Sequence, residues 1–149
     1  MQGTSTDLAF VPDASVMLPW CFEDERTPYT EALLDRLIEG EAVIVPSHWP
    51  VEVLNTLVQA KKRGRVEEEG IQGFLRDLSS FHILVDEERG LALWERVRYL
   101  AEVHHLTAYD AAYLELAQRT GLPLATLDRE LKNAAHAEHV PVLEESAAA

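Results

Sequence analysis

The sequence LTAYDAAYLELA at residues 106–117 decides how the chain is organised. Thr107 is a helix-capping residue type and Asp110 follows three positions later, so this spacing predicts a helix start. The positions that share a helical face with Asp110 are core-like, namely Tyr113, Leu114 and Ala117. Asp110 is therefore predicted to point inward, where a carboxylate needs a cation or a donor, and a functional site explains it better than capping alone. Glu115 and Arg119 are expected to pair on the solvent-exposed side.

Length and composition predict one globular domain. The chain has 149 residues, of which 47% are apolar, and the expected limits are a disordered N-terminus at 1–7, a single domain at 8–143 and a tail at 144–149. No apolar run is long enough to span a membrane, and residues 1–7 lack the basic and apolar regions of a signal peptide. Cys21 is the single cysteine, which excludes an internal disulfide and, with these features, indicates the cytoplasm.

The charge balance bears on nucleic-acid binding. A net charge of −13 argues against it, because phosphate contacts require Lys and Arg. Two features weaken that argument: some acids belong to a candidate metal site, and basic residues cluster at Lys61, Lys62, Arg63 and Arg65. This cluster is either an RNA-contacting surface or a solvated helix end favoured by the helix dipole.

Short apolar runs alternate with helical patterns along the chain. The runs are predicted strands at 8–11, 42–45, 82–85, 123–127 and 140–143. The helices between them are expected to begin at capping residues, which are Ser15, Thr27, Ser47, Asp86 and Thr107. Alternating strands and helices predict an α/β fold, a three-layer α/β/α sandwich around a mostly parallel sheet.

Four acids are expected to meet at one edge of this sheet. Asp13 and Asp128 follow predicted strands, and Glu52 and Asp110 lie near helix starts. Carboxylates gathered there repel one another and raise each other's pKa values, which divalent cations relieve. An all-oxygen set selects Mg²⁺ or Mn²⁺, and two ions about 4 Å apart would suit phosphodiester hydrolysis. Ser15 and Thr126 are candidates for orienting carboxylates or water, beside their ordinary roles in a cap and a strand.

Four short motifs in this order resemble those of PIN-domain ribonucleases. They are Asp13-Ala14-Ser15, Glu52-Val53-Leu54-Asn55, the stretch TAYDAAY at 107–113, and Thr126-Leu127-Asp128. The likeness covers roughly residues 8–143, and within the family it is strongest to the toxin half of VapBC toxin–antitoxin pairs. The resemblance implies an Mg²⁺- or Mn²⁺-dependent endoribonuclease that cuts RNA at single-stranded positions, a homodimer, and an antitoxin whose C-terminal segment covers the active-site groove.

The resemblance also assigns residues. Asp13, Glu52, Asp110 and Asp128 match the acidic quartet of the family, and the supporting polar positions match Ser15, Asn55 and Thr126. Two positions depart from the family pattern: Pro12 replaces an aliphatic strand residue, and His139 stands where a turn glycine is common. Neither departure removes a proposed ligand.

Other readings fit the sequence less well. A phospho-receiver domain needs an acidic pair after its first strand and a late lysine, whereas Asp13 stands alone there and no lysine follows Lys132. A haloacid-dehalogenase phosphatase needs Asp-x-Asp where this chain has Asp13-Ala14-Ser15. Two alternatives stay open: a non-catalytic PIN-fold binding module, and an RNA-processing nuclease without an antitoxin.

Overall fold

A computed structural model describes residues 7–144, so nearly all of the expected N-terminal segment 1–7 and tail 144–149 lies outside the described residues. The sheet has four parallel strands, β1 (Leu8–Pro12), β2 (Ala42–Val45), β3 (His82–Val85) and β4 (Leu124–Ala125), in the order β3-β2-β1-β4. The predicted strand at 140–143 is reduced to a single bridge between Leu124 and Val142. Pro141 has no N–H to extend the ladder, which is the physical reason for this correction.

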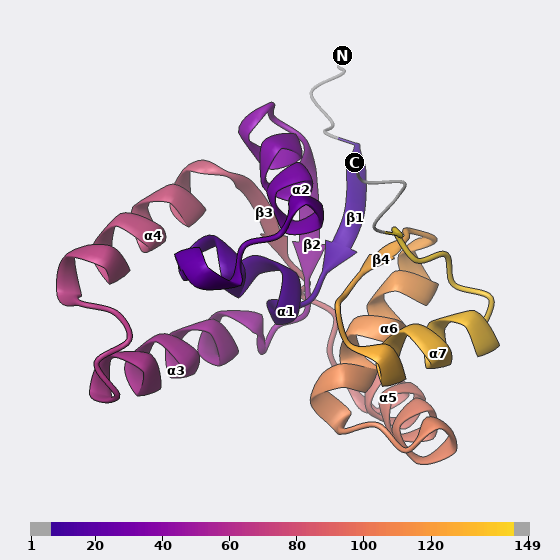
Figure 1. Cartoon of the computed structure of the whole chain (residues 1–149). Coiled ribbons are helices and arrows are strands. Elements are labelled where there is room, and N and C mark those ends of the chain that lie inside the picture. The colour runs from indigo at the N-terminus through magenta and orange to yellow at the C-terminus, as the bar shows by residue number, and fades with distance from the viewer. Residues whose placement is uncertain (1–6, 145–149) are drawn as a thin grey trace.

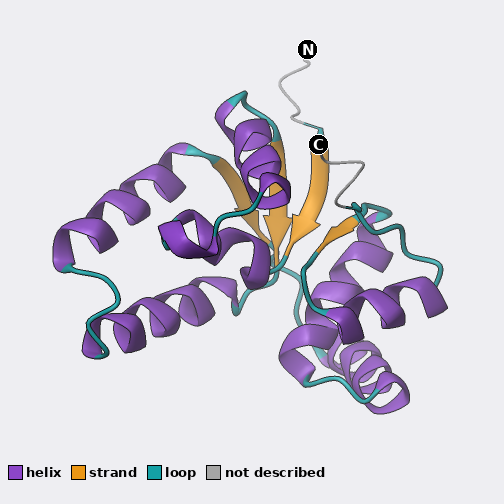
Figure 2. Cartoon of the chain, viewed as in Figure 1, coloured by secondary structure: helices purple, strands orange, loops and turns teal. Residues whose placement is uncertain are grey.

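Helices flank this sheet (Figures 1 and 2). They are α1 (Ala14–Met17), α2 (Pro28–Ile38), α3 (Trp49–Lys62), α4 (Glu68–Ser80), α5 (Leu91–His104), α6 (Ala108–Thr120) and α7 (Arg129–Ala137), with two 3-10 helices at Leu18–Trp20 and Glu23–Glu25. The α/β sandwich with a parallel sheet is therefore confirmed. Among the described residues, no helix combines the length and the apolar character that crossing a bilayer requires.

Helix starts show where local sequence signals hold. The Thr27 and Thr107 caps are confirmed, and each hydroxyl accepts a hydrogen bond from the backbone N–H three residues later. The predictions for Ser15, Ser47 and Asp86 are wrong, because the caps of α1, α3 and α5 are Asp13, His48 and Gly90. The side chains of Ser15 and Asp86 make other contacts in the structure, described below, and Ser47 lies one residue before the cap His48.

The order of the strands in the sheet indicates where a ligand site is expected. The chain runs outward from β1 through β2 to β3, and then returns to the other side of β1 to form β4. Right-handed crossovers put the helices of these two directions on opposite faces of the sheet, which gives the layers. The order reverses between β1 and β4, and in open α/β sheets the crevice at such a point, beyond the carboxyl ends of the strands, is where ligands bind.

Helix α6 carries more buried residues than any other helix of the described chain. Tyr113, Leu114 and Leu116 are each at most 1% exposed, as the pattern of residues 106–117 predicts for the face that carries Tyr113. The prediction that Glu115 faces solvent is wrong: its side chain is 2% exposed because α5 packs along that side of α6. The Glu115 carboxylate accepts hydrogen bonds from the guanidinium groups of Arg96 and Arg119, at 3.0 and 2.9 Å.

Candidate active site

Asp13 is the most buried acid of the predicted quartet, with 5% of its surface exposed. It follows β1 directly and caps α1, so the backbone N–H and the hydroxyl of Ser15 both donate to its Oδ1, at 3.0 and 2.5 Å. The hydroxyl of Thr126 donates a short hydrogen bond to Oδ2. Burial raises the pKa of Asp13 to about 6, against the lowering effect of these hydrogen bonds.

The two hydroxyls beside Asp13 also fix the end of β4. Ser15 Oγ accepts from the backbone N–H of Leu127 at 2.9 Å, and Thr126 Oγ1 accepts from that of Asp128 at 3.0 Å. The backbone of β4 is thereby tied to Asp13 across the switch point. The supporting roles of Ser15 and Thr126 in a metal site stay a prediction.

Asp128 follows β4 at the same edge. One of its oxygens, Oδ2, accepts a 3.0 Å hydrogen bond from the backbone N–H of Leu131 and so caps α7. That cap holds the side chain in a defined orientation beside the β1–β4 crevice. The strand predicted at 123–127 is shorter in the structure, at Leu124–Ala125, so Asp128 lies three residues beyond its end rather than directly after it.

Asp110 lies in the first turn of α6 and is partly buried. Burial raises the pKa of its carboxyl, and the negative charges of Asp128 and Glu52 raise it further. Asp110 in turn adds to the raised pKa of Asp13. Asp110 is therefore close enough to Asp13, Glu52 and Asp128 to interact with each of them electrostatically.

Glu52 reaches the group from α3. Its Oε1 accepts a 2.5 Å hydrogen bond from the hydroxyl of Tyr113, which stands one turn after Asp110 on α6. The imidazole Nε2 of His48 lies 3.7 Å from the same oxygen. Burial lowers the pKa of His48, opposed by the charges of Glu52 and Asp110. Across residues 7–144, His48 is the only basic side chain within ion-pair distance of any of the four acids.

The donor set has the chemistry of a site for a hard divalent cation. All four side chains offer oxygen ligands, and no Lys or Arg of residues 7–144 lies within ion-pair distance of any of them. The residue types and their charge therefore fit such an ion. Their arrangement does not form a ready-made metal site, because no group of three or more His, Cys, Asp or Glu side chains within residues 7–144 is placed to hold one.

Three further residues of this region escaped the sequence analysis as functional candidates: His48, Tyr109 and Tyr113. With Val51, Glu52 and Asn55, His48 and Tyr109 line a pocket of about 370 Å³. Asn55 is exposed there rather than bonded to an acid. A signal was present in the sequence, because His48 precedes Glu52 by one helical turn and Tyr109 adjoins Asp110.

The basic cluster is only partly available for binding. Lys61 Nζ pairs with Glu68 at 2.7 Å, and Arg65 pairs with Asp24 and Glu25 at 3.0 and 2.8 Å. Lys62 and Arg63 are exposed at the end of α3. Half of the cluster is thus neutralised by acids of the same chain, and its contact with RNA stays a prediction.

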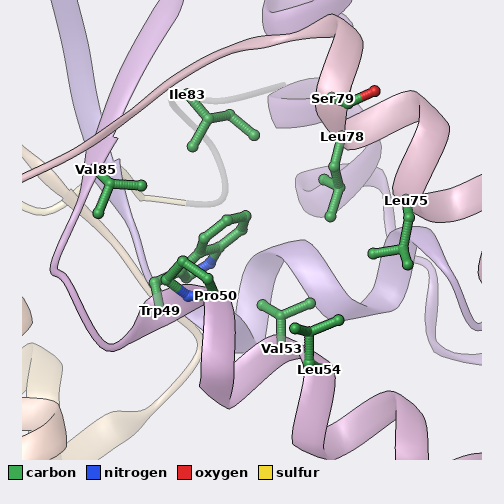
Figure 3. Close-up of a pocket in the computed structure, with 9 residues that line it drawn as sticks. All are labelled: Trp49, Pro50, Val53, Leu54, Leu75, Leu78, Ser79, Ile83 and Val85. Atoms are coloured by element: carbon green, nitrogen blue, oxygen red, sulfur yellow. The ribbon is translucent and has the colours of Figure 1, made fainter.

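A separate pocket lies between α3, α4 and β3 (Figure 3). It has a volume of about 270 Å³, and its lining is almost wholly apolar: Trp49, Pro50, Val53, Leu54, Leu75, Leu78, Ser79, Ile83 and Val85. Without a titratable side chain in its lining, this pocket offers packing surface but no acid–base or metal chemistry.

Comparison with known sequences finds similar proteins that are named ribonucleases. Ribonuclease VapC3 of Pyrobaculum aerophilum is 29% identical over 136 residues, which are 91% of this chain and 98% of that protein. Ribonuclease VapC12 of Mycobacterium tuberculosis is 30% identical over 100 residues, 67% of this chain and 74% of that protein.

Solved structures share the fold. PAE2754 of Pyrobaculum aerophilum superposes with a TM-score of 0.64 at 27% identity, covering 85% of this chain and 79% of that one. FitAcB of Neisseria gonorrhoeae gives a TM-score of 0.62 at 19% identity, with 92% and 98% covered. The family description "PIN domain" matches residues 10–137, most of the chain. The acidic edge, the strand order and these matches together establish that the chain belongs to the PIN-domain family.

Proposed function

We propose that this protein is a metal-dependent endoribonuclease and the toxin of a type II toxin–antitoxin pair. One observation carries the proposal: carboxylates from four separate segments act on one another at the switch point of the sheet without a Lys or Arg partner in residues 7–144. The names of the VapC ribonucleases that resemble the chain support RNA as the substrate.

The cation that fits this donor set is Mg²⁺ or Mn²⁺. The residues that would bind it are Asp13, Glu52, Asp110 and Asp128. Two such ions would suit phosphodiester hydrolysis. When bound, such ions lower the pKa of water and neutralise the charge on the phosphate. The raised pKa of Asp13 is consistent with a site in which a bound cation would stabilise the ionised carboxylates.

The chain's own residues set the geometry. Ser15 and Thr126 hold both oxygens of Asp13, so this carboxylate is oriented before RNA arrives. Tyr113 holds one oxygen of Glu52 and leaves the other for a ligand. Groups of this kind, one step removed from the ligands, keep a metal site in its productive orientation.

The test is cleavage of a mixed-sequence RNA by the purified protein in Mg²⁺, in Mn²⁺ and in EDTA. We expect cleavage that depends on the metal and disappears in Asp13→Asn. Asp35→Asn is the matched control, because Asp35 is exposed on α2. Cleavage in EDTA, or an active Asp13→Asn protein, would overturn the assignment of the site. RNA binding without cleavage would favour the non-catalytic binding module.

The toxin role requires partners. We infer a cognate antitoxin that covers the active-site groove, and a homodimer formed through exposed apolar side chains of α5 and the edge strand β3, including Leu84, Leu91 and Trp94. Induced expression of the wild type in the cytoplasm of a bacterial host should arrest growth, whereas expression of Asp13→Asn should not. Growth without arrest, together with cleavage in vitro, would favour an RNA-processing nuclease without an antitoxin. Light scattering of wild type and Trp94→Glu tests the dimer.

A further inference from the structure

The pocket between the first turns of α3 and α6 has features that hydrolysis alone does not require. It adjoins the acidic site through Glu52, and its volume is about 370 Å³. Beside Glu52, its walls are two rings, one aliphatic side chain and one amide, from His48, Tyr109, Val51 and Asn55. Flat apolar surface next to neutral hydrogen-bonding groups is the chemistry that recognises a nucleobase.

The aromatic part of the pocket is built from both helices. The ring of Tyr109 is 65% exposed, yet its centroid lies 5.4 Å from that of His48 with the planes inclined at 56°. His48 also meets the ring of Tyr113 edge-on, with the ring centroids 5.3 Å apart. Two tyrosines of α6 thus hold the imidazole in place, while the ring of Tyr109 stays open to solvent.

The polar part of the pocket has unused hydrogen-bonding capacity. Nε2 of His48 is buried and has no hydrogen-bond partner among the described residues, since the nearest oxygen of Glu52 is 3.7 Å away. A buried polar atom without a hydrogen bond destabilises the protein, and a ligand that hydrogen-bonds to that atom removes this penalty. Asn55 presents an exposed amide, which can both donate and accept.

Charge decides which part of a nucleotide fits here. Glu52 lines the pocket, and Asp110 lies close enough to act on His48. A phosphate would be repelled by these carboxylates, so the phosphate belongs on the side of the four acids where a cation would sit. The uncharged base is the part that can enter the pocket.

We propose that this pocket binds one unpaired nucleobase of the RNA next to the scissile phosphate, stacked on Tyr109 and read at its edge by His48 and Asn55. The inference rests on the proposed nuclease function and deepens it. Unpaired bases are the parts of RNA whose faces and edges are free for such contacts. His48 and Tyr109 become specificity-determining residues, and the nucleotide preference of cleavage is expected to depend on them.

The first experiment measures binding without cleavage. Short unstructured RNAs carrying one 2-aminopurine at a central position, flanked by mixed nucleotides, are titrated with Asp13→Asn protein in Mn²⁺. We expect quenching of the 2-aminopurine fluorescence as the base stacks. Adding Tyr109→Leu should weaken binding by about fivefold or more and abolish the quenching, whereas Tyr109→Trp should preserve both.

Tyr99→Leu is the matched control, because Tyr99 is a 58% exposed tyrosine of α5 that does not line the pocket. It should bind and quench like the Asp13→Asn parent. An equal loss of binding in Tyr99→Leu and Tyr109→Leu would overturn the proposal, and so would unchanged quenching in Tyr109→Leu. Failure of the parent to bind or quench the probe would overturn it as well.

A second experiment reads specificity in the active protein. His48→Phe keeps a ring against Tyr109 and Tyr113 but removes the nitrogen that would contact the base edge. Sequencing of the cleaved ends should show a changed nucleotide preference at one position beside the cut. An identical preference in wild type and His48→Phe would remove His48 from base recognition.

These experiments separate the pocket from the nuclease. If the wild type cleaves no RNA in Mg²⁺ or Mn²⁺ while Tyr109→Leu still abolishes quenching, the nuclease proposal fails and the base pocket stands. If the wild type cleaves RNA and Tyr109→Leu changes neither quenching nor cleavage preference, the base pocket fails and the nuclease proposal stands.

Discussion

The hydroxyl of Tyr113 donates a 2.5 Å hydrogen bond to the carboxylate of Glu52 and so joins α6 to α3 across the acidic site. Tyr113 itself is 1% exposed, so its ring is fixed by the core and its hydroxyl has little freedom. The carboxylate of Glu52 is partly exposed and would otherwise sample several rotamers. The core of α6 therefore determines where this carboxylate points.

Tyr113→Phe should reduce cleavage while the fold is kept. The ring continues to fill the core, but Glu52 loses its fixed orientation, so we expect kcat to fall about 10-fold and the metal concentration for half-maximal activity to rise. Loss of a hydrogen bond to a charged group should lower the free energy of unfolding by about 1–2 kcal/mol. Tyr99→Phe on α5 is the control, and unaltered metal dependence in Tyr113→Phe would contradict the orienting role.

Asp110→Asn should abolish metal-dependent cleavage and raise the stability of the metal-free protein. Burial and the charges of Asp128 and Glu52 all disfavour the ionised form of Asp110, so removing its charge relieves repulsion. Melting temperatures in EDTA at pH 7 provide the measurement, with Asp35→Asn as the control on α2. A lower melting temperature for Asp110→Asn would contradict the repulsion.

Asp13 should make metal-free stability depend on pH. Its pKa is about 6 in the folded protein, against an ordinary value of 3.8, so the folded state holds this proton more tightly than the unfolded state. The contribution of Asp13 to stability is therefore complete below about pH 4 and is lost as the pH rises through 6, a change of about 3 kcal/mol.

Comparison with Asp13→Asn isolates this contribution from the other acids. Urea unfolding in EDTA should show that the variant gains on the wild type between pH 4 and 7. Saturating Mn²⁺ should reduce this difference, because a cation favours the ionised carboxylate. A difference between the two proteins that is constant over this range would refute the raised pKa.

Glu115→Gln should destabilise the protein without involving the acidic site directly. The carboxylate of Glu115 is buried between Arg96 and Arg119, and losing these charged hydrogen bonds should cost about 2 kcal/mol. Glu102→Gln is the same substitution in an exposed pair with Arg98, both side chains being 66% exposed, and should have a clearly smaller effect because solvent screens this pair. Equal effects in urea unfolding would show that burial of Glu115 contributes nothing.

Sequence patterns alone determined the elements that depend on neighbouring residues. Apolar runs locate β1, β2 and β3, and the hydroxyls of Thr27 and Thr107 cap α2 and α6 as their spacing predicts. The positions of Asp13 and Asp128 after strands follow from the same patterns, because parallel strands bring their carboxyl ends to one edge. Glu52 and Asp110 join this set because they lie near predicted helix starts, and the resemblance to PIN-domain ribonucleases supports both.

Tertiary structure decided what depends on contacts between distant segments. Asp86 was predicted to cap the helix that follows β3. In the structure its carboxylate pairs with Arg119 at 2.6 Å, and α5 begins later, with Gly90 as its cap. Glu115 has the spacing of a surface ion pair, yet the packing of α5 against α6 buries it. Such outcomes depend on which helix faces which, and local periodicity does not carry that information.

The features of the acidic site also fall into those set by local sequence and those set by tertiary structure. The sequence determined which carboxylates are present and at which ends of strands and helices they lie, since these follow from local order. Only the tertiary structure brought Tyr113 to Glu52 and placed His48 against Tyr109. Both contacts join α3 to α6, and their geometry is set by how the core packs these two helices rather than by either helix alone.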